Sequence, residues 1–206
     1  MKALEEGSTI SQEDYLGEGD KMPDLAQTQV ENVQIDYGIL MINDGEVDAR
    51  TIGPTRGGGE FSVKQSIRDI EFDGMKGKTK GMQVVESVDA LLTVTHLDTS
   101  MASLADAMPY ATYDDVSDTI TCGSANIGVI PLTSYLKNVT MYCKTIKGDY
   151  RKITLYNAMS EKEFSLVAKA KGEGEVSLEI NAHWDPLDGL ADLYKIETVA
   201  SIVPAI

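Results

Sequence analysis

Apolar and polar residues alternate along most of the chain from Val30 onward, which is the period of a β-strand. One such run covers residues 33–41 and another covers residues 60–68. The longest, residues 82–97, is rich in Val, Thr and Leu and has no Gly or Pro. Because successive side chains point to opposite sides, each run predicts a strand with one core face and one outer face.

Further runs predict strands in the second half of the chain, at residues 119–122, 124–130, 139–147, 151–156, 164–170, 175–184 and 194–203. Gly148-Asp149 predicts a hairpin turn, and Gly172-Glu173-Gly174 separates two strands of mirrored pattern. In the second of these strands, the inward side is predicted to be Val176, Leu178, Ile180, Ala182 and Trp184. The total is eight to ten strands.

Turn chemistry marks the connections between the early strands. We expect a turn at Asn43-Asp44-Gly45, a loop over residues 51–59 and a Gly/Lys connection over residues 73–81. Apolar residues occupy odd positions up to Ile67 and even positions from Ile70 onward, which predicts a bulge or a bend near Arg68.

One helix is predicted, from Thr99 to Met108. Its apolar residues are spaced three and four apart, at Met101, Leu104, Ala105 and Met108. Asp98 or Thr99 is expected to cap it, and Pro109 ends it. The predicted fold is therefore mostly β, a sandwich or barrel with one short flanking helix.

Two regions of different composition divide the chain. Residues 1–29 carry many acidic residues and glycines and few large apolar ones, so we expect an acidic arm. That arm is either a disordered solubilising tail or a segment that orders against a neighbouring subunit. Residues 30–206 are expected to form one β domain, since 42% apolar residues suffice for one core.

The chain has 33 acidic and 18 basic residues, a formal net charge of −15. This charge argues against a nucleic-acid binder, which normally shows a basic face, and against an anionic membrane surface. No apolar run approaches the roughly 18 residues of a membrane span. Residues 1–20 lack a basic and an apolar region, so we expect no secretory signal there.

Catalytic chemistry is not predicted. Cys122 and Cys143 are interpreted as two reduced thiols, although one bridge is possible, and they match no zinc pattern with His96 and His183. Neither histidine has a nucleophile in a recognisable motif. The glycines at 57–59 lack the Lys-Ser/Thr ending of a phosphate-binding loop. We expect no enzyme activity, cofactor or metal.

The run from Gly59 to Gly81 resembles the major tail (tail tube) proteins of long-tailed bacteriophages. It contains a Gly-rich segment before a strand, a Phe-Asp-Gly turn at 72–74 and a Lys-Gly connection before a long Val/Thr strand. The short helix follows in the same order, and Ala-His-Trp-Asp-Pro at 182–186 is similar to the family's close. The resemblance covers residues 30–198; the acidic arm has no counterpart in it.

This resemblance implies a virion structural protein, assembled in the host cytoplasm. Such subunits form a β-sandwich with a flanking helix and assemble as hexameric rings, each lending four strands to an inner β-barrel. Twenty-four strands, tilted about 40° and spaced about 4.8 Å, give a barrel roughly 48 Å across. Stacked rings enclose the tape-measure protein and later conduct genomic DNA, which is not bound specifically. Tail terminator and baseplate or tail-tip proteins are the expected partners at the ends.

Two groups of site residues follow from the resemblance. The polar sides of two strands, short-chained or acidic and without Lys or Arg, are candidates to face the lumen: Ser87, Asp89, Thr93, Thr95, Glu175, Ser177, Glu179 and Asn181. Ordinary solvent faces would look the same. The candidates for contacts between subunits or rings are Arg56, Gly57, Gly58 and Gly59.

Other functions fit the same pattern. The chain could be a solitary β-sandwich binding module of carbohydrate or adhesin type, or the inner tube of a contractile tail rather than a bare flexible one. A hydrolase on a β scaffold is the third class, for which the sequence offers no site.

Overall fold

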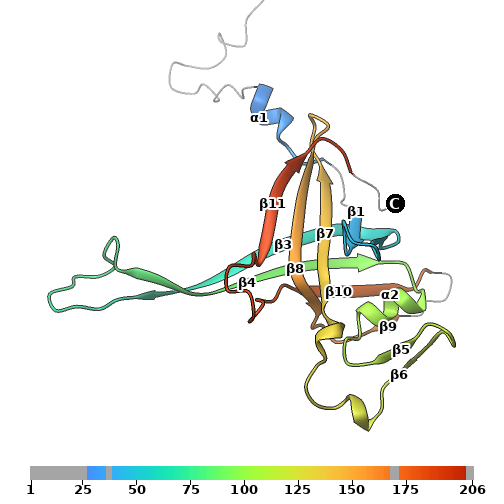
Figure 1. Ribbon diagram of the computed structural model, residues 1–206. Helices are drawn as coiled ribbons and strands as arrows, with labels where there is room; N and C mark the ends of the chain where they lie inside the picture. The colour runs from blue at the N-terminus through green and yellow to red at the C-terminus, as the bar shows by residue number, and fades with distance from the viewer. Residues whose placement is uncertain (1–26, 36–38, 168–171, 203–206) are drawn as a thin grey trace, which may run out of the picture.

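The computed structural model describes residues 27–35, 39–167 and 172–202 of the chain (Figure 1). The predicted acidic arm lies outside these residues except for 27–29. Those residues begin a short helix, α1 (Gln27–Glu31), so the prediction that the β pattern starts at Val30 is wrong. Of the predicted strand 33–41, Gln34 makes a single bridge to Thr145, and β1 (Ile39–Ile42) forms the regular part.

In the described part of the chain, nine strands form one antiparallel sheet that folds into two crossing layers (Figure 1). The first layer has the order β2 (Arg50–Thr51), β1, β7 (Leu136–Lys144), β8 (Tyr150–Ser160) and β11 (Tyr194–Val199). The second contains β3 (Thr55–Asp69), β4 (Gln83–His96), β10 (Glu175–Asn181) and β9 (Leu166–Val167). The last residues of β8, Met159 and Ser160, pair with β10 and join the layers. Among the described residues the strands close no barrel.

The core lies between the layers. Alternate residues of β4 and β10, such as Leu92 and Leu178, are buried against residues of the first layer such as Val139 and Leu155. Helix α2 (Met101–Asp106) contributes Leu104 to the same cluster. The prediction of a mostly β fold with one short flanking helix is confirmed by the sheet and by α2. The sequence pattern did not indicate the second helix, α1.

Several boundaries were predicted correctly. The long strand 82–97 is β4, and the turns at 43–45 and 148–149 are present. A register shift between Ser66 and Ile67 lies close to the bulge or bend predicted near Arg68, but it is on the partner strand rather than in β3. Its extra residue is Glu86 on the partner strand, where the pairing moves from Ser66–Ser87 to Ile67–Val85. Helix α2 is shorter than predicted, and its N-cap is Ser100 rather than Asp98 or Thr99. Asp98 instead accepts hydrogen bonds from Ser100 N–H and Ser103 Oγ.

Other predictions were wrong, each for a local reason. Residues 124–130 form a 3₁₀ turn (Ser124–Asn126) rather than a strand, because the Asn126 side chain accepts the Gly123 N–H and donates to Thr112. They follow a small hairpin of β5 (Thr112–Asp114) and β6 (Thr119–Thr121), and a second 3₁₀ turn (Leu132–Ser134) precedes β7. Trp184 lies outside the core and is 59% exposed, since β10 ends at Asn181.

The predicted strand 164–170 is reduced to β9 over Leu166–Val167, and residues 168–171 lie outside the described part. The loop predicted over 51–59 is largely strand: β2 ends at Thr51 and β3 begins at Thr55. The three glycines at 57–59 therefore lie within β3.

Candidate assembly surfaces

The outer face of β3, β4 and β10 brings the lumen-facing candidates together. Ser177 lies directly opposite Thr95, and Glu179 lies opposite Thr93, so the side chains of each pair share one face. Asp89 and Ser87 continue this face along β4, where they lie opposite Lys64 and Ser66 of β3. Glu175 and Asn181 are at the two ends of β10. The eight candidates thus share one face, and all of them are exposed or half-buried. Leu91, which lies between Asp89 and Thr93 and opposite Asn181, interrupts this polar face.

The two predicted faces contain no Lys or Arg of their own. Neighbouring segments of the same chain add cations beside them. Lys162 Nζ lies 2.6 Å from Glu179 Oε1, and Lys64 lies opposite Asp89. Arg56 Nη1 donates to Glu175 Oε1. Three of the acidic candidates therefore have a cation beside them within the same chain.

The segment Arg56–Gly59 forms a bulge in β3. Pairing moves from Thr55–His96 to Gly59–Val94, so β3 has two more residues than β4 between these pairs. Gly57 and Gly58 both have φ of 79°, a conformation that favours glycine. The bulge aims the Arg56 guanidinium at Glu173 and Glu175, whose hydrogen bonds raise the pKa of Arg56. A Cβ on Gly59 would lie 2.7 Å from the Met141 sulfur, so the two layers approach closely there.

A surface that the sequence analysis missed is the projecting part of the β3–β4 hairpin, residues 64–88. It extends from the body as a two-stranded ribbon (Figure 1). Large apolar side chains are exposed along it: Ile67, Ile70, Phe72, Met82, Val84 and Val85. The sequence did contain a signal for this surface. Apolar residues occur on both sides of these strands, whereas a half-buried strand has them on one side only.

A second unpredicted surface is a cleft of about 470 Å³ beside Trp184. Tyr135 and His183 line it with their rings 5.1 Å apart in an edge-to-face arrangement. His183 is held by the Asn157 carbonyl at 3.0 Å and by Glu161 Oε1 at 3.0 Å. Leu187 lines the cleft and is 92% exposed. Leu190, three residues further along the chain, is 96% exposed.

One histidine and the two cysteines were weighed for catalysis or metal binding, and they lie in different environments. His96 is fully buried, and neither of its ring nitrogens has a hydrogen-bond partner. Burial lowers its pKa, although Asp98 nearby acts in the opposite direction. Cys122 is exposed and Cys143 is buried, and the two are not bridged. Within the described ranges, no three His, Cys, Asp or Glu side chains gather as metal ligands. None of the helices in these ranges has the length and apolar character to cross a bilayer.

No family model and no curated protein matches this chain. Solved structures that match this chain include the following two. One is titled "Virion of native gene transfer agent (GTA) particle", with 11% identity and a TM-score of 0.40 over 72% of this chain and 92% of the other. The other is titled "Tail of empty GTA particle computed with helical refinement, C6 symmetry", with 11% identity and a TM-score of 0.37 over the same shares. Both structural neighbours are thus parts of gene transfer agent particles.

Proposed function

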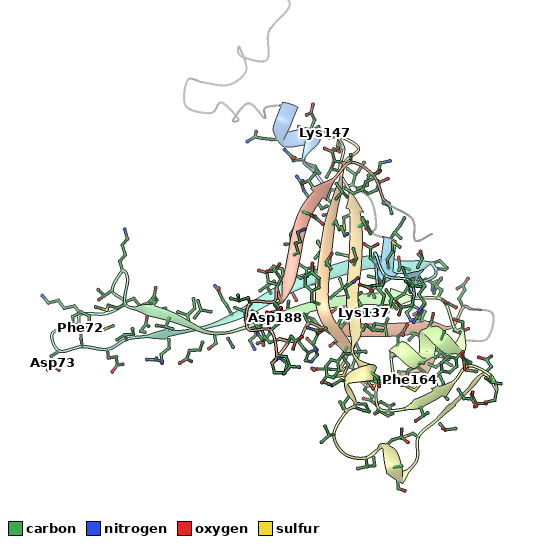
Figure 2. All side chains as sticks on the ribbon, viewed as in Figure 1. Phe72, Asp73, Lys137, Lys147, Phe164 and Asp188 are labelled. Atoms are coloured by element: carbon green, nitrogen blue, oxygen red, sulfur yellow. The ribbon has the colours of Figure 1, made fainter. Side chains whose placement is uncertain are left out.

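We propose that this chain is the tail tube subunit of a long-tailed, phage-like virion, and that six copies form a ring whose stacks make a conduit. The observation that carries the proposal is the projecting part of the β3–β4 hairpin. Phe72 and Asp73 mark its far end, away from the body (Figure 2). A two-stranded ribbon is marginally stable by itself, and exposed apolar surface of this extent is typical of an interaction site.

The second layer has a strand edge without a partner in the described part of the chain, and ring closure by strand pairing between copies would use such an edge. Its strand order ends at β3, whose outer edge has no strand partner among the described residues. An unpaired edge presents a row of N–H and C=O groups that can pair with another chain. On the opposite side, β10 is paired with the short β9, with the end of β8 and, through the Glu161 N–H, with the residue that follows β8. Pairing of β3 with the outer edge of β9 in the next copy would continue the sheet around a ring.

In such a ring the polar outer face of β4 and β10 would line the lumen. Glu179 and Thr93 would then face the cargo, tape-measure protein or DNA, while the apolar side of the same strands stays in the subunit core. The cations beside Glu175, Asp89 and Glu179 make this wall close to balanced rather than strongly acidic. A wall with few free cations would bind a phosphate backbone weakly and let DNA slide.

The oligomeric state tests the proposal. We expect purified full-length protein to form rings or tubes with sixfold symmetry in negative-stain electron micrographs. Sedimentation velocity should show species far larger than the 22.3 kDa monomer, increasing with concentration. A protein that stays monomeric at every concentration, with and without tail-tip components, would overturn the proposal.

The lumen assignment has its own test. Glu179→Lys should leave tube assembly intact but place a ring of positive charge on the wall, together with the released Lys162. Tubes of this variant should retain duplex DNA at low salt and release it at high salt, since phosphate binding is salt-dependent. Glu46→Lys, in the exposed turn after β1, is the control with equal charge. Equal DNA retention by both variants would place Glu179 outside the lumen.

A second candidate function is the solitary binding module. The cleft beside Trp184 favours it, because exposed aromatic rings next to polar side chains suit a saccharide. Titration of monomeric protein with a panel of oligosaccharides, followed by the fluorescence of its single tryptophan, tests this function. Saturable binding together with a lack of self-assembly would favour the binding module over the tube subunit.

A further inference from the structure

We propose that the tip of the hairpin from one copy docks on residues 184–192 of another copy, an inference that rests on the proposed self-assembly. The hairpin tip is defined as residues 70–82, and the acidic loop as residues 184–192. The two surfaces lie far apart in one copy: Figure 2 shows Phe72 and Asp73 at the far end of the ribbon, away from Asp188. Two residues after the loop, Tyr194 contacts Phe61 in the body part of β3, with ring centroids 5.4 Å apart. An extended two-stranded ribbon does not bring its own tip to its own root, so the partner is a second copy.

The charges of the two surfaces are complementary. The hairpin tip has three lysines, Lys76, Lys78 and Lys80, against two carboxylates, in a chain that is acidic overall. The acidic loop has three aspartates, Asp185, Asp188 and Asp192, and no Lys or Arg. All three lysines are exposed, as are Asp188 and Asp192. Opposite charges of this kind steer two surfaces together and select one register over others.

Apolar side chains on both surfaces match as well. The tip exposes Phe72 and Ile70, and the acidic loop exposes Trp184, Leu187 and Leu190. The cleft beside Trp184, about 470 Å³, has room for an aromatic ring. Aromatic residues buried at the centre of an interface and surrounded by charges on the rim are the arrangement that contributes most binding energy.

The acidic loop is held in shape before any partner binds. Asp185 accepts the Leu187 N–H at 2.8 Å, and Asp188 accepts the Leu190 N–H at 3.1 Å. These two turns hold the leucine side chains outward, so little ordering cost remains for docking. Because tip and loop are different surfaces, the contact is head-to-tail, which generates closed rings or open stacks rather than isolated dimers.

Charge reversal tests the pairing. Lys76→Glu/Lys78→Glu/Lys80→Glu should raise the concentration needed for assembly at least about tenfold. Adding Asp188→Lys/Asp192→Lys should restore it to within about threefold of the unmodified protein, because the reversed charges again match. The control with the same net charge is Lys137→Glu/Lys144→Glu/Lys147→Glu, at lysines outside both the tip and the acidic loop, and it should assemble normally. Circular dichroism and thermal unfolding verify that each variant is folded.

The single tryptophan reports docking directly. Trp184 is 59% exposed, so assembly through the acidic loop should shift its emission to shorter wavelength. Phe72→Ser should remove the shift, whereas Val116→Ser, at an equally apolar and 92% exposed position elsewhere, should not. Assembly of the unmodified protein with unchanged Trp184 emission, or without rescue by charge reversal, would overturn the docking and leave the tube function standing. A protein that never assembles overturns both.

Discussion

The two halves of the β3–β4 hairpin have the same strands and similar residues but opposite surroundings. In the body, Ala90, Leu92 and Val94 of β4 are at most 4% exposed. Beyond the register shift, Ile67 and Val85 are 48% and 53% exposed. The first half is covered by β7 and β8, whereas those strands do not reach the second half (Figure 1). Backbone pairing therefore continues where burial stops, and the second half is the part of the hairpin that an assembly partner would cover under the proposed function.

The largest effect should come from removing the projecting part. Replacing residues 67–86 by a two-residue Asn-Gly turn keeps Ser66 opposite Ser87, and so keeps β3 and β4 paired in the body. We expect assembly to be abolished while the thermal unfolding of the monomer stays close to that of the full chain. Sedimentation velocity and calorimetry on the same samples measure the two properties. Tubes formed by the shortened chain would show that the projecting part is not an assembly element.

Truncation of single side chains should lower the free energy of unfolding of the monomer in the body half of the hairpin, and hardly at all in the projecting half. Leu92→Ala removes a fully buried side chain and should lower the free energy of unfolding by about 2–5 kcal/mol. Ile67→Ala, in the projecting part, should change it by less than about 0.5 kcal/mol. Urea unfolding of both variants at a concentration below assembly measures the difference. Equal losses would mean that the projecting part is buried in the monomer.

The pH dependence should come from the buried half. Burial lowers the pKa of His96 below its usual 6.5 in the folded chain, so only the unfolded chain binds the proton readily. Stability from neutral His96 is therefore present above pH 6.5 and is lost as the pH falls, by at most about 1.4 kcal/mol per pH unit. Asp106 acts in the opposite direction, because burial, partly offset by Arg50, raises its pKa from 3.8 to about 6.

Comparing the protein with His96→Leu isolates the histidine, since the Asp106 contribution is the same in both. The unmodified chain should lose more stability than His96→Leu in urea unfolding between pH 7.5 and 5.5. Parallel curves would mean that the pKa of His96 is the same in the folded and unfolded chains.

The smallest effect is expected at the bulge. Arg56 is exposed and bonded to Glu173 and Glu175, and exposed ion pairs contribute little to folding. Arg56→Gln should leave the urea midpoint of the monomer unchanged within error. If the bulge contacts a neighbouring copy, the same variant should still weaken assembly, which sedimentation at several concentrations detects. No change in either measurement would leave Arg56 with a purely local role.

Much of the fold could be predicted from local pattern. Strict alternation with no Gly or Pro indicated β4 almost to the residue, and the helix stripe before Pro109 indicated α2. These predictions worked because period and breakers act within a few residues. The strand predicted over residues 124–130 failed because one side chain, Asn126, makes bonds to Gly123 and Thr112 that no periodicity reveals.

The sequence by itself determined the fold class and the outward polar sides of β4 and β10, because side-chain alternation follows from the strand backbone alone. Only the tertiary structure decided that these two polar sides form one surface, since β4 and β10 lie 79 or more residues apart in the chain, from His96 to Glu175, and meet through pairing. It also decided that Ile67 and Phe72 remain exposed. Exposure depends on how far the other layer extends, and no residue within the hairpin encodes that distance.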